Sequence, residues 1–350
     1  MIDEVERRRA GRYTRSIVAT LLRGWIGAGV LALVGCGRTP VYGSGDRGCD
    51  GVEVDVPSLS CEPGSCQTRR AVSVPIPDNN VLIVQDRSCS MARRIGGSSK
   101  WARAVEAMSA MLSSEGADQL RWGLSLFPDG DTVPAQDPPL VAVADDRADV
   151  IVDLLGRALD PSDPNHPQQP GEPCVTNLGS AVHRASQADT FESLDGDDYV
   201  VLITDGLAEI GSIEDPTSAL GAIVRMERAG TLTFVVGFGD EVASDNLEEL
   251  GQAGGVPAPG RASYYEAGLD DLNAALRLVL RQVQCSYRLQ VDDADLPSLV
   301  VRLSDGTPVP NGTPGWTYDP DAERIAFSGQ ACDLLQAGAV AAVELELDCG

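Results

Sequence analysis

A short loop at residues 86–90 carries the residue types that bind a small, hard metal ion. Its sequence, Asp86-Arg87-Ser88-Cys89-Ser90, places a carboxylate and two hydroxyls at alternate positions. Oxygen atoms of this kind are the ligands that Mg²⁺ and similar divalent cations prefer. The loop directly follows an apolar run at 81–84. We therefore expect it at the carboxyl edge of a parallel sheet, where ligand sites of open α/β sheets gather.

Two further loops bear side chains of the same chemistry. Thr176 stands just before a predicted helix, and Asp205 follows a predicted strand at 199–203. A hydroxyl and a second carboxylate are again hard oxygen ligands. The three loops therefore predict one oxygen-lined site at the edge of the sheet.

Together these loops resemble the metal-ion-dependent adhesion site of the von Willebrand factor A-type domain. That site has a D-x-S-x-S loop, a threonine in a second loop and an aspartate after a later strand, which are matched in order by Asp86, Ser88, Ser90, Thr176 and Asp205. The resemblance covers about residues 81–283. It implies direct ligation by the three hydroxyls, with the two aspartates acting through water.

The resemblance also implies the cofactor and the kind of partner. The ion is a divalent cation, Mg²⁺ in the first place and otherwise Ca²⁺ or Mn²⁺, and one coordination position stays open for a carboxylate of a partner protein. Because only two fixed negative charges face the ion, it keeps the Lewis acidity that attracts this external oxygen.

Two cysteines flank the predicted ligands. Cys89 occupies a position where the family more often has glycine, and Cys174 lies two residues before Thr176. Because both loops are expected to converge on one ion, we predict a disulfide between Cys89 and Cys174, the alternative being two buried thiols.

Six more cysteines remain, and the sequence leaves their pairing open. Three precede the domain and three follow it, namely Cys49, Cys61, Cys66, Cys285, Cys332 and Cys349. A group of three cysteines cannot pair completely within itself. Full oxidation within one chain therefore requires an odd number of bonds between the two groups.

Apolar runs and helical periodicities alternate between residues 80 and 284. Strands covered on both faces are predicted at 81–84, 122–127, 199–203 and 232–236. One helix is predicted to start with Ser98 or Ser99 as N-cap, and further helices are predicted at 146–158, 178–189, 217–229, 243–253 and 268–284. This pattern predicts an α/β fold with a doubly wound, mostly parallel, Rossmann-like sheet.

Residues 285–350 have a different character. Apolar and polar residues alternate at 287–291 and 343–348, and Asp305-Gly306 and Asn311-Gly312 are hairpin signals. We therefore expect a small antiparallel β module after the α/β domain.

Residues 1–35 have the outline of a lipoprotein signal peptide. Six arginines are followed by an apolar run at 24–35, which is too short to span a bilayer. The run ends in Leu33-Val34-Gly35-Cys36, which resembles a lipobox and implies that Cys36 is diacylated; the alternative is an ordinary cleaved signal with a chance cysteine. Two acyl chains anchor a protein stably. Gly37 in place of aspartate suggests, by analogy, the outer membrane of the cell envelope.

The remaining segment at 36–79 is rich in Gly, Pro and Ser and contains three cysteines. It is interpreted as a tether between the anchor and the α/β domain.

Composition argues against nucleic-acid binding. The 350 residues include 27 Lys and Arg against 52 Asp and Glu, a net charge of −25. A nucleic acid is therefore not expected as partner, because binding it requires many basic side chains. The acidic run Asp195-Gly196-Asp197-Asp198 is interpreted as a solvated turn.

The sequence thus predicts an exported, lipid-anchored protein that binds a partner protein through a divalent ion, without catalysis. One alternative is a structural scaffold of the envelope whose metal loop has no function. Metal-assisted hydrolysis is a minor alternative, because no general base is evident beside the loops.

Overall fold

The computed structural model of the chain describes residues 58–59, 69–76, 78–95, 97–128, 139–167, 176–191, 194–205, 210–239, 244–258, 262–268, 271–292, 295–320 and 322–348. The predicted signal peptide at 1–35, the predicted lipid-bearing Cys36 and most of the tether lie outside these residues. In the described ranges, none of the helices combines the length and the apolar character needed to cross a bilayer.

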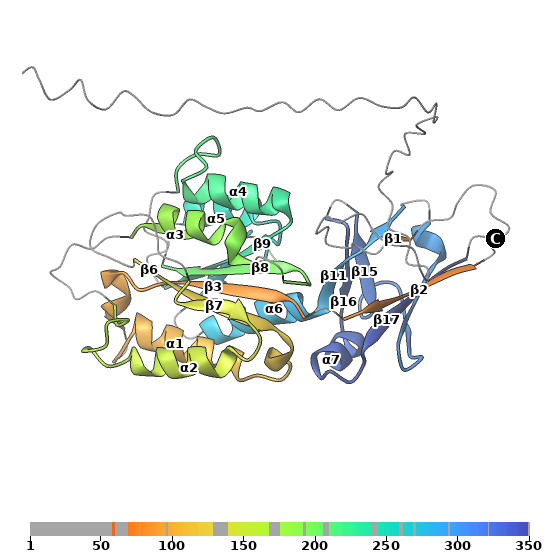
Figure 1. Cartoon of the computed structure of the whole chain (residues 1–350), viewed down its shortest axis with the longest axis horizontal. Helices are drawn as coiled ribbons and strands as arrows, with labels where there is room; N and C mark the ends of the chain where they lie inside the picture. Colours follow the sequence, from red (N-terminus) through yellow and green to blue (C-terminus); the bar gives the residue numbers. More distant parts are fainter. Residues whose placement is uncertain are drawn as a thin grey trace, which may run out of the picture. The chain divides into compact units, whose positions relative to one another are not determined.

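A mixed sheet forms the centre of the α/β domain (Figure 1). In the described part of the chain it contains six strands in the order β10-β9-β8-β3-β6-β7, and only β7 runs antiparallel to its neighbour. The strands are β3 (Asn80–Asp86), β6 (Arg121–Phe127), β7 (Val141–Ala144), β8 (Asp198–Thr204), β9 (Leu232–Phe238) and β10 (Tyr265–Ala267). The predicted doubly wound, mostly parallel sheet is confirmed.

The direction of winding reverses between β3 and β8. From β3 the chain proceeds outward to β6 and β7, and it then returns to the other side of β3 as β8, β9 and β10. Such a topological switch point is where open α/β sheets bind ligands, outside the carboxyl ends of the strands. The predicted loop at 86–90 and Asp205 follow the two strands that meet there.

Helices cover both faces of this sheet (Figure 1). The side chains of β3 alternate between the two layers, since Val81 and Ile83 belong to one buried cluster and Leu82 and Val84 to the other. The first cluster includes α1 (Lys100–Leu112), α2 (Ala148–Arg157) and α6 (Leu272–Cys285). The second includes α3 (Leu178–Ala185), α4 (Ala219–Ala229) and α5 (Ser244–Ala253).

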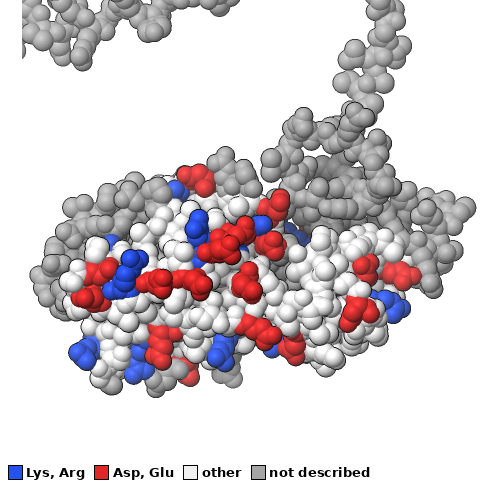
Figure 2. Space-filling model, turned by 60° about the horizontal axis from the view of Figure 1, so that its bottom comes forward, with Lys and Arg blue, Asp and Glu red and all other residues white. Residues whose placement is uncertain are grey.

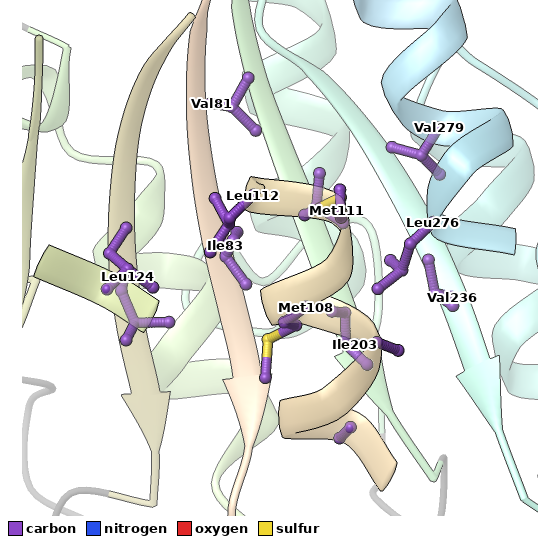
Figure 3. Packing of buried hydrophobic residues seen from close by; sticks show 14 of the residues in the cluster. Val81, Ile83, Met108, Met111, Leu112, Leu124, Ile203, Val236, Leu276 and Val279 are labelled. Carbon is purple, nitrogen blue, oxygen red and sulfur yellow. The ribbon is translucent and has the colours of Figure 1, made fainter. Parts of the chain in front are cut away.

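Figure 3 shows the first layer at close range. Met108 and Met111 of α1 and Leu276 of α6 pack against Ile83 and Ile203 of the sheet. The predicted N-cap of α1 is Ser99, whose hydroxyl accepts a hydrogen bond from the backbone N–H of Ala102 at 3.1 Å. This cap fixes the start of α1 at Lys100.

In the described residues, the C-terminal β module includes two antiparallel sheets, with strand orders β14-β13-β17-β2, where β2 is Arg69–Pro75, and β11-β16-β15. Its elements are β11 (Ser286–Arg288), β12 (Gln290–Val291), β13 (Leu299–Leu303), β14 (Pro308–Val309), β15 (Trp316–Asp319), β16 (Arg324–Phe327), α7 (Gln330–Gln336) and β17 (Ala342–Asp348). The predicted turn glycines Gly306 and Gly312 have φ of +88° and +94°. Helix α7 was not predicted.

The tether assignment is wrong for part of its length. Residues of the predicted tether form β2 (Arg69–Pro75), which pairs with β17, and β1 (Ser58–Leu59), which pairs with β12. Val72, Val74 and Ile76 pack against the core of the β module. Their period of two is a strand signal, but the prolines around them favoured a linker.

The start of β8 is joined to the β module by buried charges. The Arg324 guanidinium lies 2.7 Å from Asp197 Oδ2 and donates to the backbone carbonyl of Ser286 at 2.9 Å. Arg288 lies 3.4 Å from Asp197 Oδ1. The acidic run at 195–198 is therefore not a solvated turn, because Asp197 is a buried partner of two arginines and Asp198 begins a central strand.

A disulfide joins Cys285 at the end of α6 to Cys332 in α7, with a Cα–Cα distance of 5.4 Å. Two of the three C-terminal cysteines therefore pair with each other. The predicted link between the two cysteine groups then falls to Cys349, which lies outside the described residues, as do Cys49, Cys61 and Cys66.

Candidate metal-binding site

Asp86, the last residue of β3, is the innermost of the predicted ligands. Its side chain is fully buried, and its two oxygens accept hydrogen bonds at 2.8 Å from the backbone N–H of Ser88 and from the hydroxyl of Thr204. Burial, and after it the negative charge of Asp205, raise the pKa of Asp86 to about 6, although the bonds from Ser88 and Thr204 act in the opposite direction. Two buried carboxylates thus repel each other in this part of the fold, and a nearby cation would relieve that repulsion.

The two serines of the loop lie side by side. The Ser88 and Ser90 hydroxyl oxygens are 2.8 Å apart and hydrogen-bonded. A turn of 3₁₀ helix, η1 (Cys89–Ala92), produces this arrangement, and the N–H of Met91 donates to the carbonyl of Ser88 at 2.9 Å. The buried Met91 side chain fixes the turn to the core. Both hydroxyls therefore stand beside the Asp86 carboxylate on a backbone that the core holds in place.

Asp205 follows β8 and is 1% exposed. Its Oδ2 lies 3.2 Å from the ammonium of Lys100, the first residue of α1, which is also 1% exposed. The preceding residue, Thr204, donates to Asp86. Four of the five predicted ligands, Asp86, Ser88, Ser90 and Asp205, are thus connected through the loops after β3 and β8.

Thr176 lies two residues before α3, which packs against β3. Within the described residues, no hydrogen bond joins its hydroxyl to the other four predicted ligands, so its part in the site stays a prediction. The neighbouring Asn177 is buried, and neither polar atom of its side chain has a hydrogen-bond partner. The start of α3 therefore presents buried polar atoms that the protein does not satisfy.

Cys89 is disulfide-bonded, which excludes a free thiol at this position. Cys174, its predicted partner, lies outside the described residues. The Cys89–Cys174 pairing therefore stays a prediction.

The donor set fits a hard divalent cation. Its atoms are hydroxyl and carboxylate oxygens, which suit Mg²⁺, Ca²⁺ or Mn²⁺ better than softer metals. Among the residues that the structure describes, no cluster of three or more His, Cys, Asp or Glu side chains could hold a metal ion.

Lys100 and Thr204 are parts of the site to which the sequence analysis assigned no role. Thr204 is the last residue of a buried strand, and nothing in the sequence shows that its hydroxyl reaches Asp86. Lys100 did leave a signal. A cation at the first position of a helix opposes the helix dipole, and the first turn of α1 contains no acidic residue to balance it. A carboxylate from elsewhere in the fold was therefore to be expected beside it.

Comparisons with known proteins give remote likenesses. No family model and no curated protein matches the chain. Among solved structures, the conserved hypothetical protein BatB from Bacteroides thetaiotaomicron aligns at 16% identity over 57% of this chain and 95% of that chain, with a TM-score of 0.43. The vWF domain of the type V pili tip protein Mfa5 from Porphyromonas gingivalis aligns at 12% identity over 60% and 95%, with a TM-score of 0.42.

Proximal thread matrix protein 1 from the mussel byssus aligns at 13% identity over 66% of this chain, with a TM-score of 0.41, and this chain spans half of its length. Similarity at this level assigns no ligand or partner. The strand order of the sheet and the positions of the loops after β3 and β8 do not depend on these likenesses.

Proposed function

We propose that this protein binds a partner protein through a divalent cation, Mg²⁺ in the first place, held at the edge of the sheet by Asp86, Ser88, Ser90, Thr176 and Asp205. The observation that carries the proposal is the meeting of two buried carboxylates and two adjacent serine hydroxyls at the switch point between β3 and β8. When bound, the ion supplies a Lewis-acidic position for an oxygen of the partner.

The residues of the chain prepare this position before the partner arrives. Asp86 is held by Ser88 and Thr204, so its orientation is fixed by hydrogen bonds of 2.8 Å. The serine hydroxyls are neutral ligands, which leave the charge of the ion largely uncompensated. A carboxylate on the partner is therefore the ligand that the site favours.

The charges on one face of the protein give no competing explanation. On the face shown in Figure 2, acidic and basic side chains are interspersed, with no continuous basic area among the coloured atoms. The net charge of −25 repels an acidic partner at long range. Binding through a local cation explains how so acidic a protein could still take a carboxylate.

We further propose that the protein is exported and anchored at Cys36 to the cell envelope, in the outer membrane. The support is the arginine-rich start, the short apolar run and the lipobox-like sequence at 33–36. Metabolic labelling with a palmitate analogue tests this: Cys36→Ser should abolish the label, and a label that persists would contradict the anchor.

Thermal unfolding with added MgCl₂ or MnCl₂ tests the metal claim. Metal should raise the melting temperature of the wild-type protein, because an ion that binds only the folded state stabilises it. Ser90→Ala should lose this increase. Ser162→Ala, which removes a hydroxyl from an exposed turn, is the matched control and should keep it. Equal responses from wild type and Ser90→Ala would remove the basis for the site.

A structural scaffold is the alternative that one observation favours. Because Lys100 already neutralises Asp205, the loops can be ordered without metal. Crosslinking pull-downs from intact cells separate the two functions. Partners of a metal-dependent binder should disappear with EDTA and with Asp205→Ala, whereas partners of a scaffold should persist in both.

A further inference from the structure

One buried cation in the site has no place in the predicted ligand set. Lys100 is the only lysine among the 27 basic residues of the chain. Its side chain is 1% exposed, although lysine is almost never fully buried without a partner. It also stands at the start of α1, where the helix dipole disfavours a positive charge. These costs require a compensating interaction, and the structure provides one in Asp205.

Three elements are arranged around this ammonium. The Lys100 backbone N–H donates to the carbonyl of Arg93 at 3.0 Å, which ties the start of α1 to the loop that carries the serines. Its Nζ lies 3.2 Å from Asp205 Oδ2, at the end of β8. After β9, Gly239 has φ of +120°, and a Cβ there would come within 2.9 Å of the Lys100 Nζ. The absence of a side chain at 239 therefore makes room for the lysine.

The Lys100 ammonium changes the net charge of the metal site. Asp86 and Asp205 contribute two negative charges in their ionised forms, and Lys100 contributes one positive charge. Counted over these three described residues, a divalent cation changes the net charge from −1 to +1, whereas without Lys100 the total would be zero. A buried net charge is unfavourable. A ligand with a single negative charge brings the total back to zero, whereas a neutral oxygen ligand does not.

We propose that Lys100 is a resident counter-cation of the metal site, which weakens the binding of the divalent ion and makes the metal-loaded site select an anionic ligand. The proposal rests on the metal-dependent function proposed above. Without metal, Lys100 neutralises the Asp205 carboxylate. With metal, the ion and the partner's carboxylate bind cooperatively, because each compensates the charge of the other.

Lysine is suited to this role and arginine is not. Its charge is compact and sits on a flexible stem, whereas guanidinium is a wide planar fork. The space beside Gly239 is filled by the terminal atoms of the lysine stem.

Calorimetric titration with MnCl₂ of the wild type and of Lys100→Met tests the proposal. Loss of one positive charge close to a divalent ion should tighten Mn²⁺ binding about tenfold or more. Acetate, used as the anionic probe, should bind to the Mn²⁺-loaded variant more weakly than to the Mn²⁺-loaded wild type. Arg281→Met, which removes a cation paired with Asp333 beside the β module, is the control for net charge and should leave both affinities unchanged.

The outcomes distinguish this inference from the function on which it rests. Equal Mn²⁺ and acetate affinities in wild type and Lys100→Met overturn the counter-cation and leave the metal site standing. If Mn²⁺ binds to Lys100→Met but not to the wild type, both the counter-cation role and the proposed function are overturned, because the ammonium then occupies the position of the metal in the natural protein. Failure of both proteins to bind Mn²⁺ refutes the proposed function, and the inference with it.

A measurement on the unaltered chain covers the case in which Lys100→Met does not fold. Lysine labelled with ¹³C and ¹⁵N gives signals from one side chain, because the sequence has one lysine. The two ε-protons should be inequivalent, as expected for a buried ammonium, and their signals should move on addition of MgCl₂ until the site is saturated. Signals typical of an exposed lysine, or signals unmoved at saturating Mg²⁺, would overturn the proposal.

Discussion

Replacing Asp198 with asparagine should stabilise the protein, but only above about pH 5. Asp198 opens β8 in a largely buried position, where burial raises the pKa of its carboxyl from the ordinary 3.8 to about 6. Asn80 donates to its Oδ1 at 2.9 Å, which lowers the pKa in part, and the charge of Asp197 raises it. An asparagine at 198 can keep the bond from Asn80, since its amide oxygen also accepts.

The sign follows from linkage between protonation and folding. Between about pH 4 and 6 the folded protein binds a proton at Asp198 that the unfolded chain has already lost, so acidification through this window stabilises the fold. Above about pH 6 the Asp198 carboxyl is ionised in the folded protein, and the free energy of unfolding is then lowered by the whole cost of burying this charge. The shift of about two units in the pKa of Asp198 corresponds to about 3 kcal/mol of unfolding free energy. Partial exposure of the side chain reduces this cost to about 2 kcal/mol.

Urea unfolding of the oxidised protein at pH 8, 6 and 4, in EDTA and at constant ionic strength, measures this difference. Asp198→Asn should be more stable than wild type by about 2 kcal/mol at pH 8, by less at pH 6, and by nothing measurable at pH 4. Asp189→Asn, which alters an exposed ion pair with Arg184, is the control and should change little at any pH. A gain for Asp198→Asn that is the same at pH 4 and pH 8 would refute the electrostatic reasoning.

Three further perturbations test the packing around the site and the module. Ser99→Ala should cost about 1 kcal/mol of unfolding free energy through loss of the α1 cap, measured by urea unfolding, and a cost near zero would contradict the capping role. The double variant Cys285→Ser and Cys332→Ser should lose about 2–4 kcal/mol, since the bond closes a sequence separation of 47 residues; equal melting temperatures with and without reductant would contradict this. Arg324→Met should destabilise by about 3 kcal/mol at neutral pH, because Asp197 loses its nearest buried cation, and an effect below about 0.5 kcal/mol would show that Arg288 alone suffices.

The central elements of the fold could be predicted because their signals are local. The run at 81–84 became the middle of β3, and the cap at Ser99 is where the pattern placed it. The edge strand β10, three residues long, was missed because so short a segment has too few positions to show a period. Local patterns report burial and helix ends, and these are the features that they located here.

Contacts between distant parts of the chain could not be predicted in the same way. Strand β2 pairs with β17 about 270 residues later, and the sequence of β2 does not indicate its partner. The same limit applies to the site: the spacing identified the oxygen ligands, but the approach of Lys100 to Asp205 joins residues 105 apart. Unusual placement of a charge, here a lysine at a helix start without a local acid, is the kind of sequence signal that can point to such a contact.

The pairing of β2 with β17 also determines how the protein would carry mechanical load. Seven residue pairs connect β2 to β17, and four residues after β2 ends the chain becomes β3, which leads to Asp86. A pull between the proposed anchor and a bound partner would run lengthwise along β2. Because the ladder bonds lie perpendicular to the strand, such tension loads them together in shear instead of opening them one by one. If the protein is anchored and binds a partner as proposed, the β module would thus resist tension applied along β2.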